Sequence, residues 1–426
     1  MQNKNKIFIL LILGALLFYR PLLGILYIFF LPGFLLYINL DKNKKIDEVI
    51  SFSIALSLVI TVLNGFFLNT FSGLNFLTVF TSLTSLIVIF GLIYLLRKSF
   101  IIKYNFEFDK EKIIYILLII ISLSVLFLNT YEPHFDNDYP IHYDEWSRLL
   151  ETNHIIEQET FNNRYNPQFV GHPDSAIRMN PGFQFILSQF YILSGVNQIL
   201  FFKHLPSIFA VLTGFILFSL LKKIGNFKIG ILAILFLSLL KTNDNTLGIS
   251  FLVALTMTFP LLYSLFYSLH NVFKEKKSIY LLISSLIYFT ILVIHEQTGA
   301  AFLPIIILYV LYSTIKLLFK DKKIIFTKKG TIISLISVII PLFSLYVARE
   351  LLWKGTFKES FNSLIKLIVW EGITKTSYPY NFILFYGTAL SILAIIGIIF
   401  IYKKIDFDIF LIWSLIATGQ VINFYF

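Results

Sequence analysis

The chain has 426 residues, of which 57% are hydrophobic and only 14% are charged, and it contains no cysteine. This composition, with a mean hydropathy of +0.80, excludes an ordinary soluble globular protein, and the lack of cysteine excludes disulfides and thiolate metal sites. The net charge of +11 is carried by lysine clusters between apolar runs, which is typical of cytoplasmic loops. We therefore expect a membrane protein and no nucleic-acid partner.

Apolar runs long enough to cross a bilayer recur along the whole chain. A hydrocarbon core of roughly 30 Å needs about 20 apolar residues per helix, and the runs lack the alternation of a β-barrel. We therefore predict an all-α polytopic protein with about 13 spans. In chain order they lie at about 7–19, 22–39, 50–70, 75–96, 113–129, 204–221, 227–240, 246–269, 278–294, 299–319, 331–352, 380–402 and 407–426. The first run lacks a small-residue cleavage site, so we interpret it as a retained helix.

The only long polar stretch is 130–180. It holds nine of the 24 acidic residues and four of the seven histidines. Because a membrane protein that collects its titratable groups in one water-facing segment tends to use them, we expect the chemistry there.

The lysine clusters predict the sidedness of the protein. The lysine clusters all fall on the cytoplasmic side only if 181–196 does not cross the membrane. This segment has sixteen residues, which is also short for a membrane span. The N-terminus is then cytoplasmic, and an extracytoplasmic segment covers 130–203. In this segment 181–196 lies along or dips into the outer face. The connections 241–245, 295–299 and 353–379 face the same side.

Residues 143–158 have the pattern of an amphipathic helix lying on the headgroup layer. Its apolar side would carry Trp146, Leu149, Leu150 and Ile156. Its polar side would carry Asp144, Arg148, Glu151 and Glu157.

Asp144 is the first candidate catalytic residue. At a helix start beside an apolar surface, a carboxylate can take a proton from an acceptor hydroxyl or amide. The alternative is that Asp144 and Glu145 only cap the helix. Asp136 and Asp138 are rival carboxylates in the same stretch.

The stretch also repeats a His-x-Asp step, as in His142/Asp144 and His172/Asp174. Asp136, Asp138 and His142 offer the mixed carboxylate and imidazole ligands of a divalent cation such as Mg²⁺ or Mn²⁺. The alternative is that such spacings arise by chance in an acidic loop.

Further candidates lie at the predicted outer ends of later spans. His295 and Glu296 interrupt an apolar stretch, either as functional groups or as a water-exposed helix end. Arg349 could bind a lipid phosphate bidentately, pair locally with Glu350, or extend to the interface. Lys241 and Asp244 form either a site or an ordinary polar turn.

The sequences YDEWSRLLETNHIIEQETF (143–161) and NPGFQFILSQFYILSGV (180–196) resemble the first outer loop of the GT-C superfamily. These integral-membrane glycosyltransferases take sugars from polyprenyl-phosphate carriers. They include protein O-mannosyltransferases, the aminoarabinose transferase of lipid A and the oligosaccharyltransferase subunit. The resemblance runs from about 113 to the C-terminus, and 1–112 looks like an N-terminal extension. The step GHPDSAIRMNPGF (171–183) has Asp174 where a second proline is expected, so the match is partial.

The resemblance implies a multi-pass cell-membrane enzyme with an outward-facing site. It would move a sugar from a polyprenyl-phosphate donor to a lipid, glycan or protein acceptor, with inversion. Asp144 looks like the family's acceptor-activating carboxylate, with Glu145, Asp136 or Asp138 in reserve. The donor phosphate would meet Arg349, Arg178, Lys241 and His295. The remaining substrate contacts would come from His142, Glu296, Asp244 and His172.

Two other function classes stay open. A transporter or flippase for a lipid-linked or anionic solute would place ionisable residues near the midplane on broken helices. The other class is a non-catalytic scaffold or receptor, which no residue pattern in the sequence favours.

Overall fold

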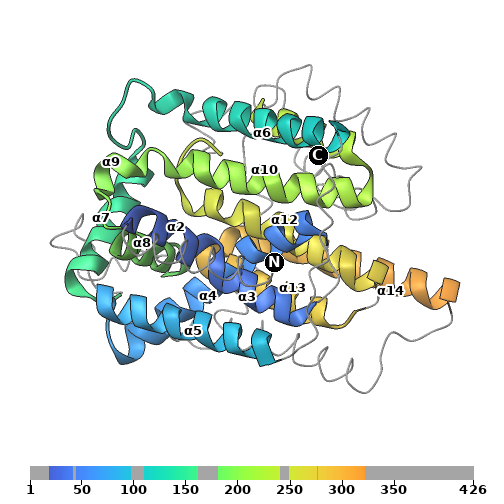
Figure 1. The fold of residues 1–426 in the computed structure, drawn as a ribbon, viewed down its shortest axis with the longest axis horizontal. Helices are drawn as coiled ribbons and strands as arrows, with labels where there is room; N and C mark the ends of the chain where they lie inside the picture. The colour runs from blue at the N-terminus through green and yellow to red at the C-terminus, as the bar shows by residue number, and fades with distance from the viewer. Residues whose placement is uncertain are drawn as a thin grey trace, which may run out of the picture. The chain divides into compact units, whose positions relative to one another are not determined.

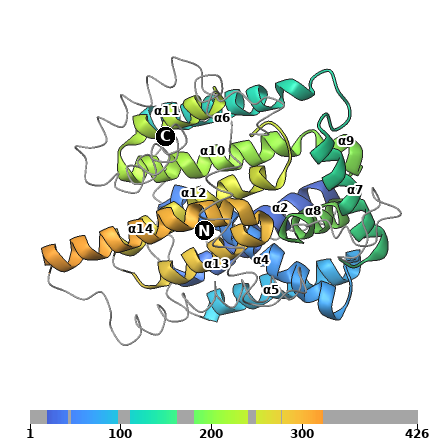
Figure 2. The same cartoon turned by 180° about the vertical axis from the view of Figure 1, so that it is seen from behind.

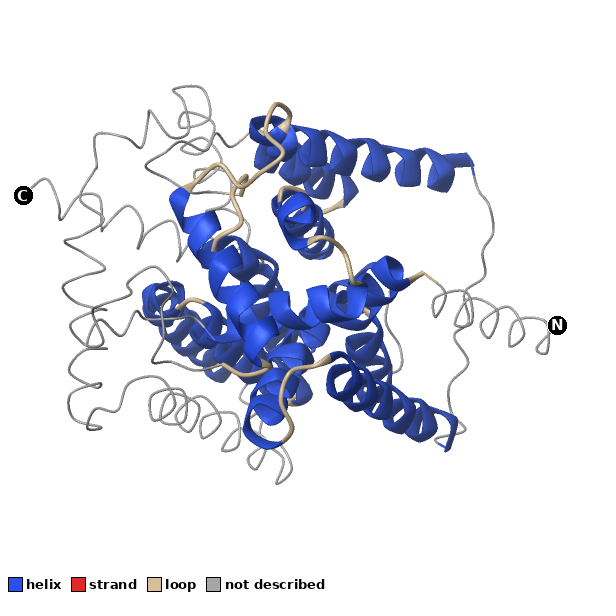
Figure 3. Ribbon diagram, turned by 90° about the vertical axis from the view of Figure 1, so that its left-hand side faces the viewer, coloured by secondary structure: helices blue, strands red, loops and turns tan. Residues whose placement is uncertain are grey.

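The computed structural model describes residues 19–41, 45–96, 110–161, 181–239, 249–275 and 277–321. These ranges are helical and contain no strand (Figures 1 and 3), which confirms the predicted all-α class for this part of the chain. The predicted spans 7–19, 331–352, 380–402 and 407–426 lie outside the described residues.

The chain divides into two compact units. Unit 1 combines residues up to Lys110 with 133–205, and unit 2 combines 111–132 with the chain from Pro206 onward. In unit 1, residues 133–205 group with the N-terminal helices. The predicted boundary at 112 stays a prediction.

The helix bounds of unit 1 follow the apolar runs closely. Its helices are α2 (Arg20–Phe29), α3 (Leu31–Leu40), α4 (Ile46–Phe71), α5 (Phe76–Leu96), α7 (Tyr143–Gln158), α8 (Pro181–Ser194) and α9 (Gln198–Phe202). The short 3₁₀ turn η1 (Glu132–His134) lies at the unit boundary. The helices of unit 2 are α6 (Lys110–Tyr131), α10 (Leu205–Ile224), α11 (Phe227–Ser238), α12 (Ala254–Glu275), α13 (Ile279–Ile294) and α14 (Glu296–Asp321).

Five stretches of the described chain are long and apolar enough to cross a bilayer. They are Arg20–Leu40, Ile46–Phe71, Phe76–Leu96, Ile113–His134 and Gln198–Ile224. Phe227–Ser238 and Ile279–Ile294 are apolar but shorter. These lengths agree with a membrane protein, while the count of about 13 spans stays a prediction.

The predicted span 22–39 is broken into α2 and α3 at Phe30, whose backbone leaves the helical region (φ −142°, ψ −57°). Pro32 opens α3, and a proline disfavours helical geometry in the residue before it. Gly33 then lets α3 approach α4 so closely that its N–H bonds the Ser57 hydroxyl at 2.8 Å. Small residues permit this kind of contact between apolar helices.

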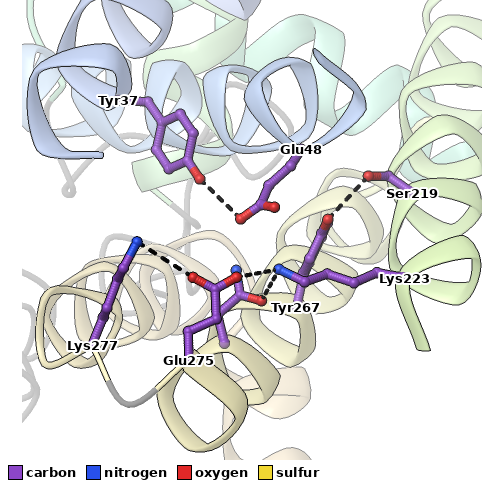
Figure 4. Close-up of polar contacts among 8 residues, drawn as sticks. Tyr37, Glu48, Ser219, Lys223, Tyr267, Glu275 and Lys277 are labelled. Carbon is purple, nitrogen blue, oxygen red and sulfur yellow. Dashed lines mark hydrogen bonds and ion pairs between the residues drawn. The ribbon is translucent and has the colours of Figure 1, made fainter. Parts of the chain in front are cut away.

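Helix α4 forms the core of unit 1, and its polar residues face inward. The Asn64 amide donates to Gln189 Oε1 on α8 at 2.8 Å, and Gln189 Nε2 donates to the Thr61 carbonyl at 2.8 Å. At the other end of α4, the Tyr37 hydroxyl donates to Glu48 at 3.1 Å (Figure 4). Buried polar groups need such partners, so these bonds fix which face of α4 turns inward.

Helix α8 is buried among other helices along its whole length. That it lies along or dips into the outer face of the membrane stays a prediction. It packs against α2, α4, α5 and α7. Its last carbonyls accept from Arg20 at the start of α2, with Nη2 to the Ile192 oxygen at 3.0 Å. The same guanidinium lies over the ring of Phe76, which starts α5. The C-terminal end of α8 therefore lies where α2 and α5 begin.

In unit 2, α6, α10 and α11 share an apolar core around Leu126, Phe218 and Ile234, and Figure 2 shows α11 beside the α6–α10 pair. Helix α12 begins at Ala254 instead of the predicted 246. The residues just before it are buried without being helical, and the Phe251 carbonyl accepts from the Thr256 hydroxyl. The same carbonyl also accepts from the Val253 N–H at 3.1 Å, so this non-helical segment keeps its backbone paired.

A lysine joins α10 to α12 in unit 2 (Figure 4). Lys223 Nζ donates to Asn271 at 2.7 Å and to Glu275 at 2.6 Å, and it lies 5.3 Å from the Tyr267 ring centre. Lys277 reaches the other oxygen of Glu275 at 3.5 Å. A half-buried ion pair with this many partners fixes the relative register of the two helices.

Candidate functional site

The start of α7 is fixed by a capping box. His142 is the N-cap, and its Nδ1 accepts from the Asp144 N–H at 3.1 Å. In return, Glu145 Oε2 accepts from the backbone N–H groups of Ile141 at 3.1 Å and His142 at 3.3 Å. Reciprocal bonds of this kind satisfy the donors that a helix start leaves open. Glu145 is fully buried in this role, so its predicted catalytic role is corrected to a structural one.

The cap engages Nδ1 of His142, a residue predicted for the metal and substrate sites. A neutral imidazole has one nitrogen with a lone pair and one that carries a proton. Because Nδ1 accepts from Asp144, the proton must lie on Nε2. In the described ranges, no three His, Asp or Glu residues lie close enough together to hold an ion. Asp136, Asp138 and His142 do not form such a group in these ranges, and metal binding by them stays a prediction.

The backbone of Asp144 is held at the helix start, while its carboxylate has no partner among the described residues. Its backbone is held by His142, its side chain is partly exposed, and no described residue bonds its oxygens. It lies in the first turn of α7, where the helix dipole favours negative charge. Among the described residues, the Asp144 side chain is therefore not engaged in a hydrogen bond or ion pair.

The two rival carboxylates, Asp136 and Asp138, differ from Asp144 and from each other in their surroundings. Asp138 Oδ1 pairs with Lys203 Nζ at 2.7 Å, and this hydrogen bond and positive charge lower the pKa of Asp138. A lowered pKa makes a carboxylate a weaker base. Asp136 is exposed and has no described partner. The two residues predicted as one metal pair thus occupy different environments.

The buried face of α7 differs from the predicted one. Glu151, expected in water, is 1% exposed and packs against α8, whereas Leu150, expected on the apolar side, is 40% exposed. Of the four apolar residues predicted, Leu149 is the buried one, and Ile155 joins it. The exposed stripe instead carries Tyr143 and Leu150.

Glu151 is buried because α8 supplies partners for it. Its Oε2 accepts from Arg148 Nη1 at 3.0 Å and from the side-chain amide of Gln184. The Thr152 hydroxyl completes the cluster through Gln184 Oε1. Hydrophobic periodicity did not predict this cluster; the only signal was a run of polar residues at spacings of three and four on one face.

The other predicted residue pair lies in unit 2. His295 ends α13, and its Nδ1 lies 2.6 Å from the Thr298 hydroxyl, while Glu296 opens α14. The Tyr288 hydroxyl donates to the Gly299 carbonyl at 3.0 Å across the same break. These contacts stabilise the break between the two helices. The remaining predicted residues Arg349, Arg178, Lys241, Asp244 and His172 lie outside the described residues.

Comparison with known proteins does not assign the chain to a family or a function. No protein-family model matches the sequence, and no curated protein or solved structure is significantly similar to the chain. The site therefore has to be interpreted from its own chemistry. It consists of one carboxylate held at a helix start, beside a buried ion pair on the same helix.

Proposed function

We propose that the chain is a GT-C-like membrane glycosyltransferase that moves a sugar from a polyprenyl-phosphate donor to an acceptor on the extracytoplasmic face. The observation that carries the proposal is Asp144, whose backbone the capping box holds and whose carboxylate has no partner among the described residues. Glu145 caps the helix and Asp138 pairs with Lys203. Asp136 is exposed, has no described partner and remains the rival candidate.

In the proposed reaction Asp144 takes the proton of the acceptor hydroxyl or amide as that group attacks the anomeric carbon. The new bond forms on the face opposite the leaving group, and the bond from carbon to the phosphate oxygen breaks. The polyprenyl phosphate departs with the electron pair, so the anomeric centre is inverted. Cationic groups near the phosphate would stabilise the charge it gains; Arg349, Arg178, Lys241 and His295 remain the candidates.

The test is sugar transfer in membranes containing the protein, with radiolabelled polyprenyl-phosphate sugars as donors. A general base contributes roughly 10²- to 10⁴-fold, so Asp144→Asn should reduce transfer at least about a hundredfold with expression unchanged. Glu157→Gln makes the same carboxylate-to-amide change at an exposed site on the same helix and should leave transfer intact. Full activity of Asp144→Asn would refute its role as base.

The proposed sidedness has its own test. Because the chain has no cysteine, a single Leu200→Cys substitution gives one thiol at a side chain that is 51% exposed. A membrane-impermeant maleimide should label it in intact cells. Labelling that requires lysis would place this segment in the cytoplasm.

A transporter or flippase is the second candidate, and the broken helices favour it. The chain leaves the helix at Phe30 in unit 1 and at His295 in unit 2. Interrupted helices expose backbone groups that transporters use to hold solutes. Movement of a lipid-linked sugar across the membrane of proteoliposomes, without any acceptor, would support this alternative. This movement would persist in the Asp144→Asn variant.

A further inference from the structure

Lysines from two connections of unit 2 meet at the ends of α10 and α12 (Figure 4). Lys223 lies in the last turn of α10 and Lys277 follows α12, and they pair with the two oxygens of Glu275 at 2.6 Å and 3.5 Å. Lys222 and Lys274 are the sequence neighbours of Lys223 and Glu275 in the last turns of the same helices. Four lysines therefore gather at one end of unit 2, with a single glutamate among them.

The described charges at this end do not balance. Four lysines and one glutamate leave a net charge of +3, and Asn271, the other polar partner of Lys223, is neutral. Like charges that are held close together repel, so this arrangement costs free energy unless an anion joins it. The positive-inside rule explains on which side of the membrane lysines lie, but it does not explain why two separate connections bring theirs to one carboxylate.

The outer lysines of this cluster are accessible from the surface. The side chain of Lys277 is 43% exposed, and Lys274 is exposed as well. Lys223 is half-buried and lies against Asn271 and the Tyr267 ring inside the unit. An anion can therefore reach the exposed ammonium groups without entering a cavity.

An apolar surface lies at the same level on α14. The Phe273 ring, next to Lys274 in the sequence, contacts the ring of Tyr309 on α14, with 5.6 Å between the ring centres. Leu308 and Tyr312 flank Tyr309 on α14 and are 47% and 44% exposed. In a membrane protein such leucines face acyl chains, and tyrosine is common at the level of the headgroups. Positive charge beside an apolar surface suits an amphiphile, whereas a free phosphate ion would use only the lysines.

We propose that the ends of α10 and α12 bind the headgroup of an anionic phospholipid. Lys274 and Lys277 donate to the phosphate oxygens, and the acyl chains lie along α14 beside Leu308 and Tyr312. The lysine clusters predict this end to be cytoplasmic, and the cytoplasmic leaflet is the one that carries anionic lipids. The bound lipid offsets the repulsion among the lysines and so stabilises the folded chain. This site is independent of the sugar transfer proposed for the other side of the membrane.

The test follows the thermal unfolding midpoint of the full chain in a zwitterionic detergent as phospholipid is added. Phosphatidylglycerol should raise the midpoint saturably. Phosphatidylcholine with the same acyl chains has no net charge and should raise it much less. Inorganic phosphate at the same concentration should leave the midpoint unchanged, because it lacks the acyl chains.

Single substitutions locate the site. The attraction of one lysine to an anionic membrane surface corresponds to roughly a fivefold change in binding. Lys274→Gln and Lys277→Gln should therefore each raise the phosphatidylglycerol concentration at half of the midpoint shift about fivefold, while Lys274→Arg and Lys277→Arg keep the charge and should respond like the wild type. Lys228→Gln is the control for overall charge. Lys228 is exposed in the first turn of α11, whose Phe227 packs against Tyr115 on α6, and its removal should leave this concentration nearly unchanged.

The shift is measured against each variant's own midpoint without lipid, so a loss of stability from separating Lys277 and Glu275 does not enter the comparison. Equal shifts with phosphatidylglycerol and phosphatidylcholine would overturn the site, and so would an equal shift with inorganic phosphate. The site would also be wrong if Lys228→Gln were as sensitive as Lys277→Gln, since the lipid would then respond only to the overall charge of the protein.

Discussion

Substituting Gly65 by alanine tests how α4 positions α8 and, through it, the Glu151 cluster. An alanine Cβ at this position would lie 2.5 Å from Phe185 Cβ and 2.8 Å from Cδ2. Carbon atoms in contact prefer about 3.5–4.0 Å, so the ring would have to move by roughly 1 Å. Phe185 is fully buried, with Phe66 at 5.0 Å and Phe161 at 5.6 Å between ring centres, so it has little room.

Overpacking of this kind costs about 1–3 kcal/mol. With about 2 kcal/mol lost, the folding equilibrium of Gly65→Ala would fall roughly 30-fold. The assay is reversible unfolding in mixed micelles of sodium dodecyl sulfate, followed by circular dichroism.

Gly91→Ala is the matched control, since its Cβ would meet no atom within 4 Å. It should be neutral, or stabilising by up to about 1 kcal/mol through helix propensity. Combining Gly65→Ala with Phe185→Leu should recover part of the loss, because the smaller side chain makes room. An unfolding free energy of Gly65→Ala within about 0.5 kcal/mol of the wild type would refute this packing argument.

Two further substitutions test the start of α7 and its surroundings. Glu145→Ala should lower the unfolding free energy by about 1–2 kcal/mol and reduce transfer, because two backbone donors lose their acceptor and Asp144 loses its anchor. Glu145→Gln keeps an acceptor oxygen and should therefore retain most of the stability and most of the transfer activity. Equal behaviour of the two variants would contradict the capping role. For Asp138, the lowered pKa in the folded state means that its pairing with Lys203 stabilises the protein above the ordinary aspartate pKa and that this contribution is lost as the pH falls through the lowered value. The difference in unfolding midpoint between wild type and Asp138→Asn should therefore be present at pH 7 and vanish in strong acid; a difference that does not change with pH would mean that the ion pair does not form.

Local sequence was enough to predict the helices. The predicted spans 75–96 and 278–294 match α5 (Phe76–Leu96) and α13 (Ile279–Ile294) to within a residue, and the predicted 143–158 is α7. Apolar runs of span length with polar ends leave the backbone few alternatives in a bilayer. The prediction was less accurate at 246–269, where α12 starts late because the buried segment before it is held by the Thr256 hydroxyl instead of helical bonds.

The candidate site, like the helices, was predicted only in part from the sequence. Periodicity identified Asp144 at the start of a helix, and the capping signal of an acid three residues after the N-cap was visible in the sequence. Which acid caps and which stays free depended on His142, an uncommon N-cap residue. The roles of Asp138 and Lys203, 65 positions apart, could not be assigned from spacing.

What the sequence by itself determined is the helical class, the apolar runs and the polar segment between them, because these depend on local composition and on the solvent that each run prefers. Only the tertiary structure decided that α8 is enclosed by α2, α4, α5 and α7, and that α7 turns Glu151 inward. A charged residue is stable in the interior only where a distant segment supplies its partners, and Gln184 does so for Glu151. Such pairings depend on which helices pack together, and hydrophobic periodicity does not predict which helices pack together.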